Sequence, residues 1–120
     1  MKKNNFKDNV YLKHVFDAVK NIENFTRGIS KAKFIKSILI QSAVIRQLEV
    51  IGEAVKNVSV DLKRTYSEIK WKDIAGARDK LIHDYFGVDL ELVWSICKKD
   101  IPVFKKQVRQ ILKDCKFNSL

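Results

Sequence analysis

Three side chains with the chemistry to act on a phosphate group fall within eight residues of one another, at Arg78, His83 and Tyr85. Arginine keeps its positive charge and presents a planar fork of donors that matches phosphate oxygens. Histidine titrates near neutral pH, so it can take or give a proton, and the tyrosine hydroxyl both donates and accepts hydrogen bonds. We therefore expect the stretch Ala77–Asp89, which reads A-R-D-K-L-I-H-D-Y-F-G-V-D, to carry the chemistry.

Cleavage of RNA is the reaction that best suits an arginine beside a histidine, because RNA carries its own nucleophile, the 2′-hydroxyl. A histidine can take the proton of that hydroxyl or protonate the leaving 5′-oxygen, and an arginine stabilises the extra charge on the phosphorus centre. This chemistry needs no metal and no cofactor. The sequence fits it, since we find no carboxylate cluster, no His/Cys spacing typical of metal sites and no G-x-x-x-x-G-K phosphate loop.

The spacing of Arg78 and His83 restricts how they can meet. Five residues turn an ideal helix through about 500°, which leaves the two side chains about 140° apart after one full turn. They converge if the helix loosens near Leu81–His83. Alternatively, two copies of the protein meet so that Arg78 of one faces His83 of the other, which predicts a symmetric dimer with the site at its two-fold axis.

The elements around this stretch are predicted to be helices joined by short connections, in an all-α bundle of about four to five main helices. Gly28 should stop the first helix. Apolar residues are dense from 34 to 58, which predicts a long central helix after a short turn near Lys36. Helical patterns also cover 60–66, 71–82 and 89–115, with a turn at 86–88. Helix starts are expected at Asp8 or Asn9, Ser30, Ser59, Asp89, and Asp100 with Pro102.

The same patterns predict which side chains form the core. In the 71–82 helix the inward positions are Trp71, Ile74, Ala75, Leu81 and Ile82, and Trp94 should also be internal. Gly76 permits the close approach of a neighbouring helix, at a cost in helix propensity. His14 lies in the first helix without an evident partner and is given no role.

Length and composition limit the class of protein. The 120 residues are 46% hydrophobic and 32% charged, as in a globular protein, and we expect one domain over 1–120 with frayed ends at 1–7 and 116–120. No apolar run is long enough for a membrane span, and the N-terminus does not read as a signal peptide. Cys97 and Cys115 lack a C-x-x-C spacing, which predicts a cytoplasmic protein with two incidental thiols.

The formal net charge of +10 favours a polyanionic partner, either nucleic acid or an acidic protein. The alternative is a solvated basic surface that only keeps the protein in solution. Seven basic residues and two acidic ones lie between Lys98 and Lys116, so about half of the excess charge is in the last segment. That segment is a solvated helix face, a guide for RNA or a docking surface.

The central stretch resembles a known family. Arg78-x-x-x-x-His83-x-Tyr85 is similar to the R-x4-H-x-Y signature of HEPN domains, in the HepT toxin branch. The resemblance covers roughly residues 8–112. It includes Q-L-E-V-I-G-E-A at 47–54, W-K-D-I-A-G-A-R at 71–78, Y-F-G-V-D at 85–89, Val93-Trp94, and Asp100-Ile101-Pro102.

This resemblance implies a HEPN-type up-and-down bundle that forms a homodimer, with the two motifs lining a shared cleft. It implies a metal-independent RNase that is the toxin of a toxin–antitoxin pair, with Arg78 and His83 catalytic and Asp79 orienting one of them. The implied partner is a minimal nucleotidyltransferase of the MntA type, which transfers AMP from ATP onto Tyr85. That bulky anionic group would block the cleft and repel RNA phosphate.

Some of these residues also have an ordinary structural interpretation. A tyrosine at a helix end usually packs and makes one hydrogen bond, and only the resemblance favours an exposed, modifiable Tyr85. Glu49 and Glu53 share one helix face, where an ion pair to Arg46 or across a dimer is commoner than a role in a site. As a whole, the protein could instead be a non-enzymatic module that binds nucleotide or its nucleotidyltransferase partner, or a helical dimer whose motif is only structural.

Overall fold

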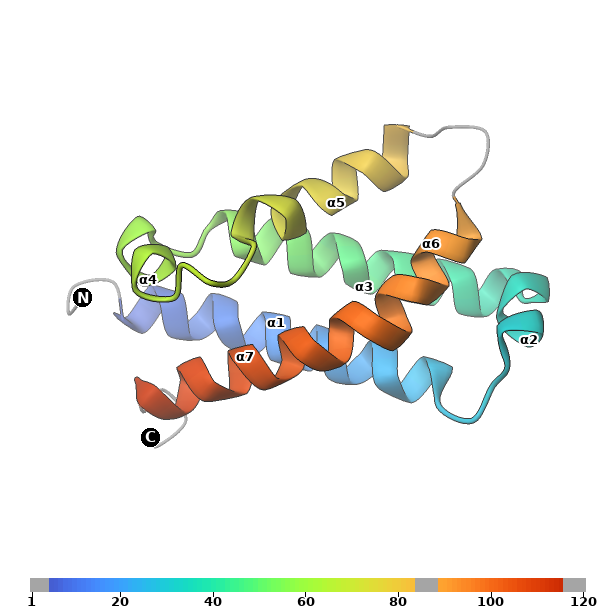
Figure 1. Cartoon of the computed structure of the whole chain (residues 1–120), viewed down its shortest axis with the longest axis horizontal. Helices are drawn as coiled ribbons and strands as arrows, with labels where there is room; N and C mark the ends of the chain where they lie inside the picture. The colour runs from blue at the N-terminus through green and yellow to red at the C-terminus, as the bar shows by residue number, and fades with distance from the viewer. Residues whose placement is uncertain (1–4, 84–88, 116–120) are drawn as a thin grey trace.

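In the described part of the chain, four long helices run back and forth: α1 (Asn5–Thr26), α3 (Ile38–Lys56), α5 (Trp71–His83) and α7 (Ile101–Asp114) (Figure 1). They are connected by short helices, α2 (Lys31–Lys36), α4 (Val60–Thr65) and α6 (Leu90–Ser95), and by the π-helical turn η2 (Ile96–Asp100). This computed structural model describes residues 5–83 and 89–115, apart from the side chains of residues 5, 6, 78 and 80–83. Those ranges contain no strand, which confirms the predicted all-α bundle.

The pair α1 and α3 forms the centre of the bundle, with α5 packed on α3 and α7 packed on α1. Apolar side chains recur every three or four residues on the facing sides of these helices, and each one contributes about 1.5–3 kcal/mol when it is fully buried. The fully buried set includes Leu12, Val15, Val19, Ile22, Val44, Val55, Val108 and Ile111. These residues belong to one hydrophobic core that ties all four long helices together.

Several helix boundaries lie where the sequence places them. The Oγ atoms of Ser30 and Ser59 accept hydrogen bonds from the backbone of α2 and α4, and Asp89 caps α6 in the same way. α1 ends at Thr26, two residues before Gly28, whose φ of +73° is the left-handed conformation that a helix-stopping glycine adopts. The expected turn near Lys36 is a single residue, Ser37, between α2 and α3.

Asp8 does not cap α1, contrary to expectation. α1 begins at Asn5, three residues before Asp8. Asp8 is 1% exposed, and its carboxylate accepts hydrogen bonds from the backbone N–H of Ser59 at 2.8 Å and from Ser59 Oγ at 2.7 Å. It therefore fastens the start of α1 to the start of α4.

α7 begins at Ile101, where Asp100 and Pro102 predict a helix start, but it continues a preceding helical segment. α6, η2 and α7 follow one another without a break, and Asp100 has helical dihedral angles and no capping side-chain bond. Pro102 has no N–H, so it cannot donate to the carbonyl four residues earlier. The backbone N–H of the preceding residue, Ile101, donates a hydrogen bond to the carbonyl of Ile96, five residues earlier in the chain. The π-helical turn thus lets the helix pass through the proline position.

The two tryptophans are confirmed as core residues. Trp71 is buried, and its ring meets Phe104 edge-on with the centroids 6.5 Å apart. Trp94 is half-buried and lies against Phe34, at 5.3 Å between centroids. Among the described residues, no helix is both long enough and apolar enough to span a membrane.

Candidate functional site

The predicted catalytic positions lie on α5, in the second half of that helix. Arg78 is within α5 and His83 is its last residue. The side chains of both, and Tyr85 as a whole, lie outside the described part of the chain. Asp79, the predicted supporting residue, is exposed on α5. The structure thus places two members of the motif on one helix by their backbone.

The α-helical conformation of α5 extends through His83, so the helix does not loosen near Leu81–His83. On a regular helix the positions of Arg78 and His83 are about 140° apart around the axis. Helix geometry therefore puts the two positions on different sides of α5. The convergence of Arg78 with His83 across two copies of the chain stays a prediction.

The first turn of α5 is held firmly. The Trp71 indole N–H donates a hydrogen bond to the Tyr66 carbonyl at 3.0 Å, and the Trp71 ring packs against α7 through Phe104. Ile74 and Ala75 follow as half-buried residues in contact with the core, as predicted. The N-terminal turn of α5, the helix that carries Arg78 and His83, is therefore held in place by contacts with the rest of the fold. The predicted inward positions at 81 and 82 lie outside the described side chains.

Gly76 does not have the packing role expected of it. Apart from the backbone of its own helix, a β-carbon added at Gly76 would meet no atom within 4 Å in the described part of the chain. The glycine is therefore not required for the approach of another helix of the same chain. The small residues Ala75, Gly76 and Ala77 are all partly exposed, and they directly precede Arg78.

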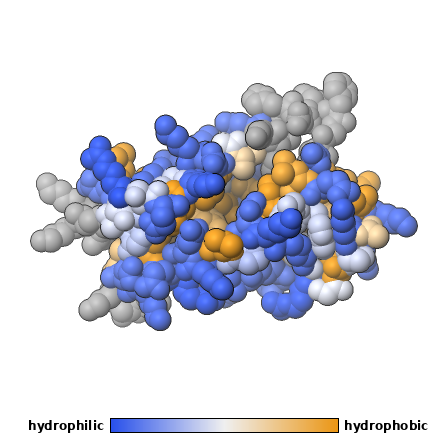
Figure 2. Space-filling view, in the orientation of Figure 1, coloured by the Kyte–Doolittle hydropathy of each residue, from blue (hydrophilic) through white to orange (hydrophobic). Residues whose placement is uncertain are grey.

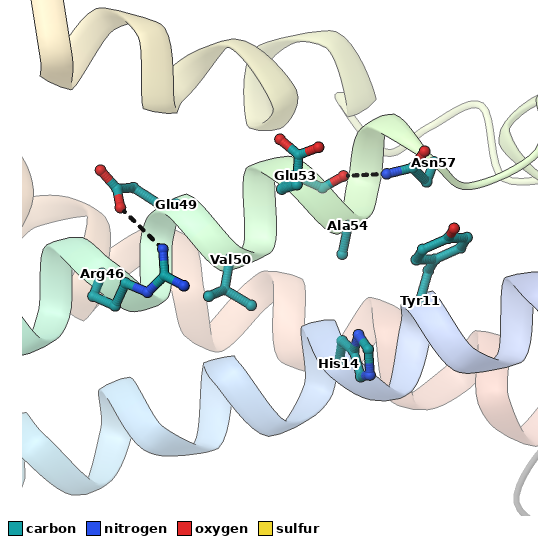
Figure 3. Close-up of a pocket in the computed structure, with 8 residues that line it drawn as sticks. All are labelled: Tyr11, His14, Arg46, Glu49, Val50, Glu53, Ala54 and Asn57. Atoms are coloured by element: carbon teal, nitrogen blue, oxygen red, sulfur yellow. Dashed lines mark hydrogen bonds and ion pairs between the residues drawn. The ribbon is translucent and has the colours of Figure 1, made fainter.

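The structure adds a hollow of about 250 Å³ that the sequence did not predict (Figure 3). Tyr11 and His14 line it from α1. Two apolar residues, Val50 and Ala54, line it from α3. The polar lining from α3 and its C-cap consists of Arg46, Glu49, Glu53 and Asn57. The available signal was the spacing of Tyr11 and His14, three residues apart on one helix face. His14, which was given no role, therefore faces a polar groove.

The two glutamates of α3 behave mainly as surface residues. Glu49 pairs with Arg46 at 3.5 Å, the predicted ion pair, and such an exposed pair contributes at most about 1 kcal/mol. Glu53 is exposed, and its backbone carbonyl accepts a hydrogen bond from the Asn57 amide. Figure 3 shows both carboxylates on the side of α3 that faces α5.

Part of the basic C-terminal segment is engaged inside the fold. Lys105 forms an ion pair with Glu23 of α1 at 2.7 Å. Lys98 donates to the Thr26 carbonyl at the end of α1, at 3.2 Å, and its ammonium lies 4.9 Å from the centroid of the Trp94 ring. A cation at a helix C-terminus is favourable because of the helix dipole. These two lysines therefore join α7 and η2 to α1.

The sequence was compared with protein families. Residues 15–111 match the family described as "Ribonuclease HepT-like". The chain belongs to this HepT-like family. The matched residues include all of α3 and α5, and therefore both Arg78 and His83. This result confirms the resemblance that the R-x4-H-x-Y motif indicated.

Individual relatives agree with this assignment. The chain is 47% identical over 103 residues to "Probable ribonuclease HepT" of Thermococcus cleftensis, an alignment that covers 86% of this chain and 94% of the relative. It is 43% identical over 102 residues to "Putative RNase TTE0752" of Caldanaerobacter subterraneus subsp. tengcongensis, with 85% and 91% covered.

One HepT-like relative is much longer than this chain. "Gamma-glutamylcyclotransferase and putative RNase MJ0434" of Methanocaldococcus jannaschii is 42% identical over 105 residues. The alignment covers 88% of this chain and 47% of that protein, so the chain spans about half of its length. No solved structure matches the chain.

Proposed function

We propose that this HepT-like protein is a metal-independent RNase and the toxic component of a cytoplasmic toxin–antitoxin pair. Arg78 and His83 are its catalytic residues, and Asp79 supports them. The observation that carries the proposal is the R-x4-H part of the motif, which lies on α5 and within the segment that matches the family. The names of the two relatives that the chain covers almost completely, which call them ribonucleases, support RNA as the substrate.

The proposed reaction uses only groups of the protein and the RNA. His83 takes the proton of a 2′-hydroxyl, whose oxygen attacks the adjacent phosphorus. A bond forms between the 2′-oxygen and phosphorus, and the bond to the 5′-oxygen breaks as that oxygen takes a proton from protonated His83 or from water. Arg78 stabilises the extra negative charge on the phosphoryl oxygens during this step. The products are a 2′,3′-cyclic phosphate and a 5′-hydroxyl.

The regular geometry of α5 supports a site shared by two copies. At the start of α3, Ile38 and Leu39 are 77% and 80% exposed. Side chains so large and so exposed are typical of an interaction surface. Figure 1 shows α3 and α5 side by side and antiparallel, so this surface lies in the half of the molecule in which α5 ends. A second copy bound symmetrically there would bring its own α5 close to the first.

Subunit complementation tests this proposal. The variants Arg78→Ala and His83→Ala are each expected to lose RNA cleavage, assayed in chelator, while they keep the fold. When the two variants are mixed, half of the dimers hold one subunit of each kind. Each mixed dimer regains one intact site of two if the arginine and the histidine come from different subunits. The mixture should then recover about a quarter of the original activity.

Other outcomes separate the alternatives. Full loss of activity in the mixture, with mixed dimers present, would place Arg78 and His83 of one site in the same subunit. Undiminished cleavage by either single variant would overturn the catalytic assignment. Unmodified protein that neither cleaves RNA nor arrests growth would indicate a non-enzymatic module.

The proposed RNase activity is inhibited by AMPylation of Tyr85 by a nucleotidyltransferase of the MntA type. The phenolic oxygen attacks the α-phosphorus of ATP, a new O–P bond forms, and pyrophosphate leaves as the phenolic proton passes to water or a base of the transferase. The new phosphodiester places negative charge two residues from His83, where it would repel RNA.

The other two tyrosines provide matched controls for this modification. The Tyr66 hydroxyl donates to Asp114 at 2.9 Å, and burial and that bond raise the pKa of Tyr66 far above its usual value. Tyr11 lines the hollow between α1 and α3. We expect a mass gain of AMP units after co-expression with the transferase in the Tyr11→Phe and Tyr66→Phe variants, and no gain in Tyr85→Phe. Modification that persists in Tyr85→Phe would refute this assignment.

A further inference from the structure

Two rows of basic side chains face one another where α1 and α7 pack together. Lys13 and Lys20 are two helical turns apart on α1, and Lys106, Arg109 and Lys113 follow one another on α7 at spacings of three and four residues. All five are exposed. α1 and α7 are antiparallel neighbours (Figure 1). We call these five residues the α1–α7 seam.

The two rows meet at Phe16 of α1. The Lys20 ammonium lies 5.7 Å from the centroid of the Phe16 ring, and the Arg109 guanidinium carbon lies 5.9 Å from the same centroid. Each cation is attracted to the ring face. The two helices thus bring one cation each to the same aromatic ring, so the basic rows of α1 and α7 belong to one surface.

The protein supplies little negative charge to this seam. Asp17 is exposed on α1 between Lys13 and Lys20. On α7 the acidic residue is Asp114, next to Lys113, and its carboxylate accepts hydrogen bonds from Tyr66 and Gln110. Within the described part of the chain, none of the five seam cations forms an ion pair or a side-chain hydrogen bond. Lys105, directly beside the seam, is instead paired with Glu23. The seam therefore has a surplus of positive charge that a partner could neutralise.

The composition of the seam favours a phosphate backbone over an acidic protein. Protein interfaces have an apolar or aromatic core from which charged residues are depleted. None of the large apolar side chains exposed in the described ranges falls within 13–20 or 106–113. In Figure 2 the larger orange areas lie over α6 and toward α2, a smaller one lies near the centre, and the lower edge is mostly hydrophilic. Phosphate contacts, in contrast, need only regularly spaced lysine and arginine.

We infer that the α1–α7 seam binds the phosphate backbone of single-stranded RNA and holds the substrate while α5 acts on it. The choice of RNA as the polyanion rests on the proposed function. The seam residues are positioning residues, distinct from Arg78 and His83 on the motif helix. Their contribution should therefore appear in RNA affinity and in its salt dependence.

The test measures binding of a fluorescent single-stranded oligouridine by the full chain that carries His83→Ala, in chelator, as a function of salt. The double variant Lys20→Gln/Arg109→Gln removes two phosphate contacts. The slope of log K against log salt should fall in magnitude by about 1.4, and affinity at about 50 mM salt should fall on the order of tenfold. Asp17→Asn should change affinity in the opposite direction and tighten binding.

Lys33→Gln/Lys36→Gln is the matched control, because it removes the same charge from exposed positions on α2. We expect clearly smaller losses of affinity and of slope in this control. Equal losses in both double variants would show that only net charge matters and would overturn the inference. An unchanged RNA affinity in Lys20→Gln/Arg109→Gln would also overturn it. Weaker binding to the nucleotidyltransferase in that case would assign the seam to a protein partner.

The binding assay separates this inference from the proposed nuclease function. Binding through the seam without any cleavage by the unmodified protein would reject the nuclease and leave the seam supported. If the unmodified protein cleaves RNA and the seam variants keep their RNA affinity, the inference that the seam binds RNA is refuted, and the nuclease proposal is still supported. In a cleavage-competent chain, the seam variants should raise KM and leave kcat unchanged.

Discussion

The contact between Asp8 and Ser59 makes a sharp prediction about stability. Asp8 is almost completely buried and accepts two short hydrogen bonds from Ser59, 51 residues away in the chain. Ser59 Oγ in turn accepts the N–H of Leu62 and caps α4. Removal of the carboxylate by Asp8→Ala therefore loosens the start of α1 and the cap of α4 together.

The size of the effect follows from the bonds that are lost. A hydrogen bond to a charged group contributes about 1.5–3 kcal/mol, and part of the gain from two such bonds offsets the desolvation of the carboxylate. The nearby charge of Asp8 also supports Lys63, whose pKa is lowered by burial and raised in part by Asp8. We expect Asp8→Ala to lower the free energy of unfolding by about 3 kcal/mol. Asp8→Asn, which keeps one acceptor, should lower it by about 1 kcal/mol.

Urea denaturation measures these changes. A loss of about 3 kcal/mol should lower the urea midpoint by about 2 M without a change in the m-value. The control is Asp17→Ala, an exposed aspartate on the same helix, which should change stability by less than about 0.5 kcal/mol. Ser59→Ala combined with Asp8→Ala should destabilise by less than the sum of the single variants. If Asp8→Ala and Asp17→Ala proved equally mild, the Asp8–Ser59 contact would not stabilise the fold as argued.

Three further predictions test the core, the thiol and the exposed face of α3. Phe34→Ala should lower the free energy of unfolding by about 3–5 kcal/mol in urea, because Phe34 is fully buried against Trp94. Burial raises the pKa of the Cys97 thiol from 9.0 to about 11, so between these pH values the folded chain retains a proton that the unfolded chain releases. The resulting stabilisation is complete below about pH 9 and is lost by about pH 11. Cys97→Ala should therefore flatten the curve of stability against pH in that range. Leu39→Glu should abolish the proposed dimer in sedimentation and, with it, RNA cleavage, whereas Val60→Glu, at an exposed position on α4, should leave both unchanged.

Local chemistry explains which parts of the fold the sequence could predict. The caps at Ser30, Ser59 and Asp89 depend on a side chain and a backbone N–H three residues later, so they can be recognised from a short stretch of sequence. The stop at Gly28 also depends only on local dihedral angles.

Long-range contacts explain what the sequence could not predict. Asp8 has the right residue type and place for a cap of α1, but its partner is Ser59, and no local pattern identifies a partner so far along the chain. The hollow between α1 and α3 has the same cause, because it exists only when Tyr11 and His14 are packed beside a different helix. Pro102 lies in the first turn of α7, as its residue type predicts, but the sequence did not predict the π-helical turn that directly precedes α7.

The geometry of α5 connects the motif to the rest of the molecule. The sequence alone left two ways for Arg78 and His83 to meet, a loosened helix or a second subunit. α5 is a regular helix through His83, which removes the first way and makes the second the basis of the proposed site. The same helix is fixed at Trp71, a β-carbon at Gly76 would contact no other described part of the chain, and α3 exposes Ile38 and Leu39 at its start. A dimer through this side would explain, with one interface, why these small and apolar residues are left uncovered and how the motif residues could act together.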